Sequence, residues 1–175
     1  LSLIIRPARL LHGVNFFTMV ALVVAETALT GRVLAAGPLT VLGELIYVDA
    51  LSAFILFIIT AIGFSCSIYM WSYLDAHVAR GAIGPKRVRR FFFLFHVFLF
   101  AMIAATMANN LGVLWVAIEG TTLATTFLIA FFRKREGLEA GWKYLILCSV
   151  GIALALFGTV LTYYSSIRVL GDESE

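Results

Sequence analysis

Charge is what this sequence has least of, because charged residues make up 13% of its 175 residues and hydrophobic residues 62%. The mean hydropathy is +1.00, far above that of an average soluble domain. Cysteine is scarce too, and Cys66 and Cys148 lack the spacing of a metal site and say nothing about the redox compartment. The composition excludes a soluble enzyme and predicts an integral membrane protein with no metal, cofactor or catalytic residue of its own.

The small excess of basic residues does not indicate nucleic-acid binding. The net charge is +3 and the isoelectric point about 9.1. However, the Lys and Arg residues cluster beside apolar stretches, where they determine membrane topology. Lipid is therefore an expected partner, and nucleic acid is not.

The longest stretch that is almost free of charge holds one carboxylate. From Phe91 to Phe132 the chain has no Asp, Glu, Lys or Arg except Glu119. A single helix through it would be about 63 Å long, roughly twice the thickness of the apolar bilayer core. The stretch must cross twice, with a break at residues 109–112, and Glu119 then falls near the middle of the membrane.

Apolar runs of this kind predict an all-α membrane bundle in a single domain covering residues 1–175. Five spans are expected, at about 14–34, 50–74, 91–108, 111–132 and 142–166. Asn15 and Glu26 interrupt the first span, and a signal peptide is the competing interpretation. A Glu within its apolar core disfavours cleavage.

The distribution of Lys and Arg between alternate loops predicts the orientation. One side would carry ten of these residues and the other only Arg32 and Arg168. The crowded side should be cytoplasmic, and it includes the N-terminus and the second-to-third and fourth-to-fifth loops. We expect a multi-pass protein of the prokaryotic cytoplasmic membrane.

Glu119 is the main candidate functional residue, since an ionisable group inside a membrane span is costly and usually has a role. Threonines 121, 122, 125 and 126 follow it. Their hydroxyls could line a hydrated seam or simply bond to backbone carbonyls one turn earlier. The second alternative explains the threonines but not the carboxylate, which in its neutral form could exchange a proton.

Two further residues are candidates for proton translocation. Lys143, beside Trp142 at the start of the fifth span, could reach the cytoplasmic interface. His96, five residues into the third span, could be a packing residue. Together Lys143, His96 and Glu119 could form a graded series from the cytoplasm toward the midplane.

Other polar and small residues have simpler interpretations. Asp49 should cap the helix that follows it. The role of Glu26 stays open, because the limits of the first span decide whether it is buried. Small residues predict close helix contacts on two spans; they are Gly120 and Ala124 on the fourth, and Gly151, Ala155 and Gly158 on the fifth.

Four segments carry a family resemblance: Tyr47–Ser52, Asn109–Leu111, Trp115–Glu119 and Leu138–Tyr144. Through them, residues 47 to about 164 resemble the antiporter-like, proton-pumping membrane subunits of respiratory complex I, Mrp antiporters and membrane-bound hydrogenases. His96–Phe100, Trp115–Leu123 and Glu139–Tyr144 are most similar to the F component of hydrogenase-4 and its formate hydrogenlyase counterpart.

The resemblance implies a role for two of the candidate residues. Glu119 matches the family glutamate that pairs with a lysine on another helix and modulates it during pumping. Lys143 matches a different lysine, at the start of the next helix. Such subunits have more helices than this chain, including discontinuous ones with midplane lysines. The resemblance thus implies a partial chain, with the partner lysine outside residues 1–175.

The function expected from this resemblance is proton or cation translocation in a redox-driven complex of the hydrogenase-4 or NADH:quinone oxidoreductase type. The partners would be other membrane subunits, which hold the redox centres. One alternative is a subunit of a Mrp-type Na⁺/H⁺ antiporter without a redox partner. Another is a structural subunit whose glutamate only hydrogen-bonds a neighbouring helix.

Overall fold

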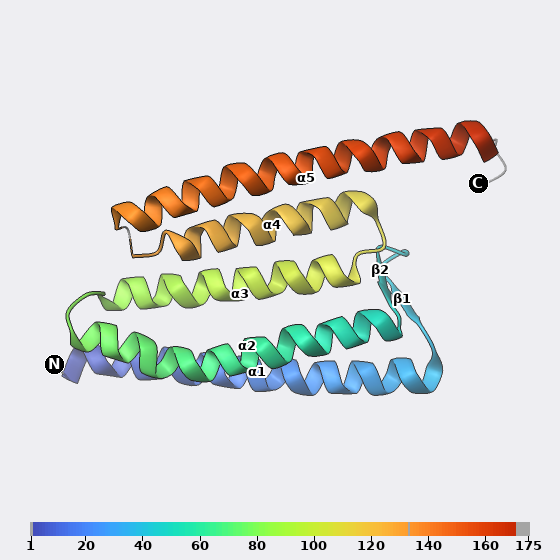
Figure 1. Ribbon diagram of the computed structural model, residues 1–175. Helices are drawn as coiled ribbons and strands as arrows, with labels where there is room; N and C mark the ends of the chain where they lie inside the picture. The colour runs from blue at the N-terminus through green and yellow to red at the C-terminus, as the bar shows by residue number, and fades with distance from the viewer. Residues whose placement is uncertain (1, 133, 171–175) are drawn as a thin grey trace. The chain divides into compact units, whose positions relative to one another are not determined.

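Five long helices and one small hairpin make up the computed structural model, which describes residues 2–132 and 134–170 (Figure 1). Side chains are described for residues 11–84, 86–132 and 134–168. The elements follow in the order α1 (Ser2–Ala36), β1 (Leu39–Val41), β2 (Ile46–Val48), α2 (Ala50–Ala79), α3 (Pro85–Met107), α4 (Leu111–Ile129) and α5 (Arg135–Leu170).

All five helices are long and apolar enough to cross a membrane, which confirms the predicted all-α class and the number of spans. Many large apolar side chains on them are exposed, such as Phe17 at 73% and Phe100 at 71%. In water such a surface would be unfavourable, but it suits contact with lipid.

Several helices extend beyond the predicted spans because polar residues continue them. The helix α3 begins at Pro85 rather than Phe91, since Gly84 takes the extended N-cap conformation and proline suits the first turn. The helix α5 begins at Arg135 rather than Trp142, and Glu136 in its first turn favours the positive end of the helix dipole. In the other direction, α4 ends at Ile129, three residues earlier than expected.

The chain forms two compact units, one up to Ala124 and one from Thr125 onward, and each is described by itself. In the first unit, α1 packs along α2, and α3 contacts both (Figure 1). A core cluster lies at one end of this group, where Val33, Val48 and Leu56 are buried. Partly buried residues surround them, namely Leu29, Leu39, Ile46, Ile103 and Met107.

The contact between α1 and α2 follows a spacing of three and four residues on each helix, as expected for antiparallel helices with an extended seam. The α1 residues that follow this spacing and are buried or partly buried are 12, 15, 19, 22, 26, 29 and 33. The buried α2 residues that follow it are 53, 56, 60, 63, 67, 70 and 74. Gly63 brings the helices close, because a Cβ there would lie 3.0 Å from both Met19 Cε and Leu99 Cδ2.

The hairpin of β1 and β2 was not predicted from the sequence. Its strands pair antiparallel with Thr40 opposite Tyr47. Its turn has positive φ angles at Leu42, Gly43 and Glu44, of which only the glycine adopts this region without strain. The Asn109 side chain donates to Glu44 O at 2.8 Å and its backbone N–H donates to Leu45 O at 2.9 Å, so the hairpin holds the α3–α4 turn.

Asparagine and aspartate cap the next helices as local chemistry requires. The predicted break between α3 and α4 is confirmed, and Gly112 N–H donates to Asn110 Oδ1 at 2.9 Å at the start of α4. The predicted cap of α2 is confirmed as well, because Ser52 N–H donates to Asp49 Oδ1 at 2.8 Å. This backbone hydrogen bond holds the pKa of the Asp49 carboxyl below its ordinary value.

Candidate functional site

Glu119 occupies the middle of α4. It is the ninth residue of Leu111–Ile129 and is partly buried. At 1.5 Å per residue it lies about 12 Å from Leu111 and about 15 Å from Ile129. The span predicted to end at Phe132 would have placed Glu119 about 20 Å from its second end, but α4 ends three residues earlier.

The threonines after Glu119 bond to the helix backbone. The hydroxyls of Thr121 and Thr122 donate to Ile118 O at 2.7 and 3.3 Å. Thr122 is also buried, with 5% of its surface exposed. The simpler of the two sequence interpretations is therefore confirmed for these two residues.

Small residues bring α4 close to α3 beside Glu119. A Cβ at Gly120 would lie 3.4 Å from Ala101 Cβ, an ordinary van der Waals contact. Ala124, one turn later, is 3% exposed. Both residues thus occupy the packing face that was predicted for them.

His96 lies at the centre of α3 rather than near its start. It is the twelfth residue of Pro85–Met107, about 16 Å from either end. Its Nδ1 lies 2.8 Å from Phe92 O, and because a carbonyl only accepts, Nδ1 carries the proton. Its Nε2 is buried without a hydrogen-bond partner among the described residues, so this nitrogen is the basic one in the neutral ring.

Lys143 belongs to the second unit, where it is the ninth residue of α5. Its Nζ lies 2.6 Å from Glu139 Oε1, and both side chains are largely exposed. An exposed ion pair one helical turn apart adds little stability. The graded series of Lys143, His96 and Glu119 remains a prediction.

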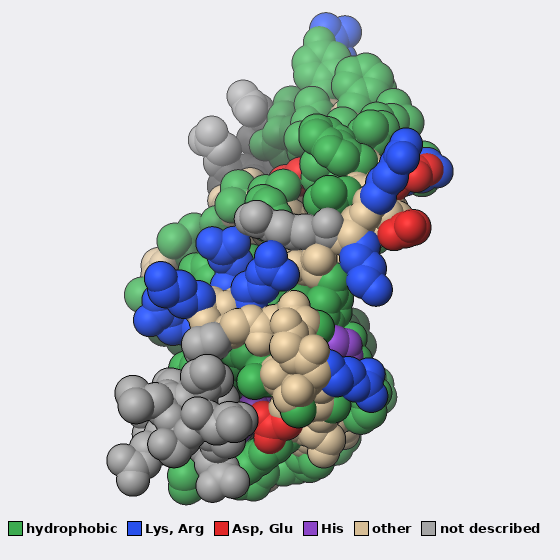
Figure 2. All heavy atoms as spheres, turned by 90° about the vertical axis from the view of Figure 1, so that its left-hand side faces the viewer, with side chains coloured by type: hydrophobic (Ala, Val, Ile, Leu, Met, Phe, Trp, Pro, Cys, Tyr) green, Lys and Arg blue, Asp and Glu red, His purple; other side chains and the backbone are tan. Residues whose placement is uncertain are grey.

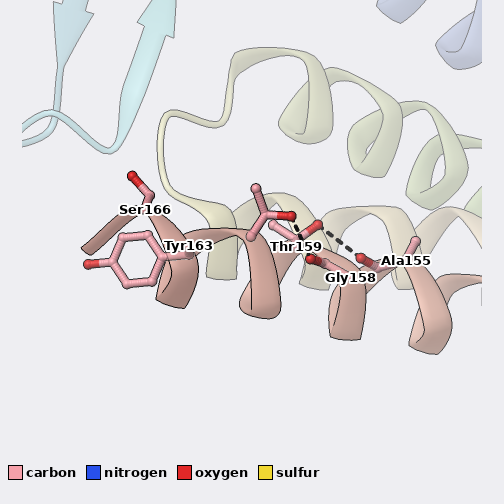
Figure 3. A pocket seen from close by; sticks show the side chains of 6 residues that line it. Ala155, Gly158, Thr159, Tyr163 and Ser166 are labelled. Carbon is pink, nitrogen blue, oxygen red and sulfur yellow. Dashed lines mark hydrogen bonds between the residues drawn. The ribbon is translucent and has the colours of Figure 1, made fainter. Parts of the chain in front are cut away.

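The predicted packing face of α5 has no close neighbour in the described part of the chain. Nothing lies within 4 Å of a Cβ built at Gly151 or Gly158. Gly158 and Ala155 instead line an open groove along the helix (Figure 3). Thr159 and Thr162 border it, and their hydroxyls donate to backbone carbonyls of Ala155 and Gly158 at 2.9 Å each.

Positive charge gathers at the end of the first unit where α2 ends and α3 begins. Figure 2 looks onto this end and shows Lys and Arg side chains there. The exposed basic residues are Arg80, Lys86, Arg87, Arg89 and Arg90. These residues form the loop that the sequence analysis expects in the cytoplasm, and that orientation stays a prediction.

Two buried polar sites lie on α1; sequence reasoning left the first, Glu26, open and missed the second, at His12. Glu26 is only 7% exposed, and His12, 2% exposed, lies 3.3 Å from Asp75 Oδ1 through its Nε2. Their three-and-four spacing with Asn15 and Met19 was the available signal. Within the described residues, no group of three or more potential ligands could hold a metal ion.

Comparison with known proteins assigns the family. Residues 108–169 match the family model described as "NADH:quinone oxidoreductase/Mrp antiporter, TM". The chain is also similar to a hydrogenase-4 component F homolog from Methylacidiphilum infernorum, with 38% identity over 130 residues, 74% of this chain and 27% of that protein. The chain belongs to the family of antiporter-like membrane subunits.

Two further relatives of this antiporter-like chain are named as a dehydrogenase subunit and an oxidoreductase subunit. F(420)H(2) dehydrogenase subunit N from Methanosarcina mazei is 32% identical over 126 residues, 71% of this chain and 24% of that protein. NADH-quinone oxidoreductase subunit N 1 from Opitutus terrae is 36% identical over 90 residues, 49% of this chain and 18% of that protein.

These matches confirm the predicted family and its likeness to hydrogenase-4 component F. Together with the five apolar helices, they make the chain a multi-pass membrane protein. It spans about a quarter or less of the length of these three relatives.

Proposed function

We propose that this chain is part of a proton-translocating membrane subunit of a redox-driven complex, of the hydrogenase-4 or NADH:quinone oxidoreductase type. The observation that carries the proposal is Glu119 at the centre of α4, within the residues that match the antiporter-like family. A carboxylate at that depth costs several kcal/mol unless a cation or a proton compensates it.

Glu119 acts on a lysine outside this chain in the proposed mechanism. When Glu119 is ionised it stabilises the charged lysine, and when it is neutral the lysine releases its proton more readily. An interaction of about 1.4 kcal/mol changes a protonation ratio tenfold, so one charge is enough to bias transfer strongly. A change elsewhere in the complex that moves the two groups apart would then drive proton release.

His96 and Lys143 are the proposed route to Glu119 from the cytoplasmic side. His96 supports this role because its buried Nε2 can take up a proton while Nδ1 stays bonded to Phe92 O. Lys143 would attract or supply protons near the interface. Its ion pair with Glu139 is exposed and weak, so the lysine can leave it for another partner easily.

The surroundings of the chain form part of the proposal. We place it in the prokaryotic cytoplasmic membrane with its N-terminus in the cytoplasm, on the basis of the positive end in Figure 2. Its partners are other membrane subunits of a hydrogenase-like or complex I-like assembly, as the names of its relatives suggest. The exposed face of α5 offers a surface to such a subunit.

Proton uptake by inverted membrane vesicles tests this proposal when electron donor is supplied to the intact complex. Glu119→Gln should reduce uptake at least about tenfold, because it removes the charge that biases protonation of the lysine. Glu44→Gln, which changes an exposed carboxylate in the hairpin turn, is the matched control and should leave uptake unchanged.

Two results would overturn the proposal. Full proton uptake in Glu119→Gln would leave the glutamate with a structural role only. Flux that requires Na⁺ but no electron donor would identify an antiporter without a redox partner. Assembly of the variant is checked by copurification of the other subunits, so that loss of uptake is not mistaken for loss of the complex.

A further inference from the structure

The seam between α1 and α2 contains polar side chains at three levels. At the first, His12 Nε2 lies 3.3 Å from Asp75 Oδ1, within the distance of an ion pair but without the geometry of a hydrogen bond. At the second, Asn15 Nδ2 donates to Ser67 Oγ at 2.5 Å. At the third, Glu26 and Thr60 line the same cavity.

The first level connects the seam with the surface. Asp75 is 48% exposed, whereas His12 is 2% exposed and its ring stacks on Trp71, with centroids 5.2 Å apart. Phe92 of α3 meets the His12 ring edge-on at 5.2 Å. The charged groups on α3 nearest in sequence to Phe92 are basic and exposed, namely Lys86, Arg87, Arg89 and Arg90. Asp75 therefore links the buried imidazole of His12 to the surface at the end of the unit where the basic residues gather.

Glu26 lies deep in the seam, about 22 Å from Leu11 and about 15 Å from Ala36. Its Oε1 accepts a hydrogen bond from Thr30 Oγ1 at 2.6 Å, and no ion pair to it occurs among the described residues. An ionised carboxylate with one hydroxyl donor and no cation would be strongly disfavoured there, whereas a neutral carboxyl would not.

Two cavities meet at Glu26. One, of about 130 Å³, is bordered by Leu56 and Thr60 of α2 and by Ile103 and Met107 of α3. The other, of about 410 Å³, is bordered by Thr27 and Thr30 and by apolar residues of α2 such as Phe54. None of the other described residues that line them is titratable. These cavities contain too few oxygen atoms to replace the coordination shell of a metal cation, but a proton needs only the carboxylate.

We propose that Glu26 is a second proton-binding site of this chain, separate from Glu119. It exchanges its proton through the polar seam with water at the end of the unit where the basic residues gather. In the protonated state, the second carboxyl oxygen carries the proton while Oε1 still accepts from Thr30. On release, water beside Asn15 and Ser67 takes up the proton and passes it to His12 Nε2, which gives it through Asp75 to water outside. Each O–H or N–H bond that breaks along this route is replaced by one that forms, and no group is left altered.

Met19 marks the point at which the seam closes. It lies between Asn15 and Glu26 on the same face of α1, is 0% exposed, and would contact a Cβ at Gly63. Its flexible side chain can change rotamer at low cost. Water can connect Asn15 with Glu26 only while Met19 is displaced, so Met19 sets when exchange occurs.

The proton site is tested with dicyclohexylcarbodiimide, which modifies protonated carboxyls in apolar surroundings. Native membranes that hold the complete protein are treated at a series of pH values, and the adducts are located by mass spectrometry. Glu26 should be modified, its modification should fall as the pH rises, and Na⁺ should not protect it. Glu44, exposed in the hairpin, is the internal control and should remain unmodified.

Each other result of this labelling overturns the proposal. No adduct at Glu26, where Glu119 in the same sample reacts, would show that Glu26 is not protonated. Labelling that does not change with pH would show a proton that is never released. Protection by Na⁺ would show a cation site instead. Labelling of Glu26 does not depend on proton pumping. The proposal for Glu26 can therefore fail while the function proposed for Glu119 holds, and the function proposed for Glu119 can fail while Glu26 is still labelled.

The route is tested by cysteine accessibility, in a background where Cys66 and Cys148 are replaced by Ala. Met19→Cys should react with a charged, membrane-impermeant thiol reagent added from the side of the α2–α3 turn. Ala21→Cys, on the exposed face of the same helix, should not react, since a thiol facing lipid does not ionise. Failure of Met19→Cys to react from that side would rule out the seam as the route.

Discussion

The two membrane carboxylates of this chain differ in what surrounds them. Glu119 lies in a stretch without other charge and close to small residues of α3, and its helix matches the antiporter-like family. Glu26 lies outside that match, is more deeply buried, and borders two cavities, one lined by α1 and α2 and the other by α1, α2 and α3. The absence of other charges in the sequence thus identifies Glu119 as a candidate, whereas burial and neighbouring cavities identify Glu26.

The largest effect is expected from filling the seam next to Glu26. Gly63→Leu places side-chain atoms where a Cβ already lies 3.0 Å from Met19 and Leu99, and overpacking of this kind costs about 1–3 kcal/mol. Thermal unfolding in mild detergent should show this loss. Gly31→Leu, on the neighbouring helix α1, is the matched control and should change stability little, because no described atom lies within 4 Å of a Cβ built there. Equal stability of both variants would mean that the helices are not in close contact at Gly63.

A smaller effect is expected from removing the hydroxyl that donates to Glu26. Thr30→Val leaves the carboxyl without this donor and should cost about 1 kcal/mol of stability. It should also shift the pH dependence of carbodiimide labelling at Glu26 while that at Glu119 stays unchanged. Thr18→Val is the control, because that hydroxyl donates to Val14 O and the residue lines neither cavity at Glu26. The same shift in both variants would contradict the assigned hydrogen bond.

The hydrogen bond at the second level of the seam should contribute less. A double-mutant cycle with Asn15→Leu and Ser67→Ala should give a coupling free energy of about 0.6 kcal/mol, the usual value for polar pairs between membrane helices. Chemical unfolding of the four proteins in detergent measures it. A coupling free energy of zero would show that Asn15 and Ser67 do not interact, and the polar seam would then be broken between His12 and Met19.

The smallest effect concerns a third carboxylate, Asp49, which lies outside the membrane spans. Because its pKa is lowered in the folded protein, the cap adds stability above about pH 4 and loses it as the pH falls through the lowered value. Asp49→Asn should keep the cap but remove this pH dependence, and Asp49→Ala should lose both. Unfolding measured across acid pH distinguishes them, and identical acid profiles for all three proteins would exclude the cap as the cause.

The number of helices could be predicted from the sequence, but not all of their limits. Apolar runs of membrane length specify a crossing whatever their neighbours are, and Asn109 and Asn110 broke the longest run as expected. The starts of α3 and α5 lay in basic segments that hydropathy excludes, although Pro85 and Glu136 favour a helix there. The hairpin was missed because its strands have three residues each and two of its turn residues, Leu42 and Glu44, give no turn signal.

The candidate site divides in the same way. Glu119 could be found from its charge alone, since no other charged residue competes within its two spans. Glu26 could not be assigned, because a carboxylate on α1 can face lipid, water or a helix, and only the pairing of α1 with α2 decides which. The role of His12 depended on Asp75, a residue more than sixty positions away.

The bond between Asn109 and the hairpin has a consequence for how the molecule is made. The two partners, Asn109 and Glu44, are 65 residues apart, with α2 and α3 between them. A ribosome must therefore complete both helices before the hairpin can fasten the turn into α4. Asn109 leaves the ribosome ten residues before Glu119, so this anchor can already hold the start of α4 when the carboxylate enters the membrane.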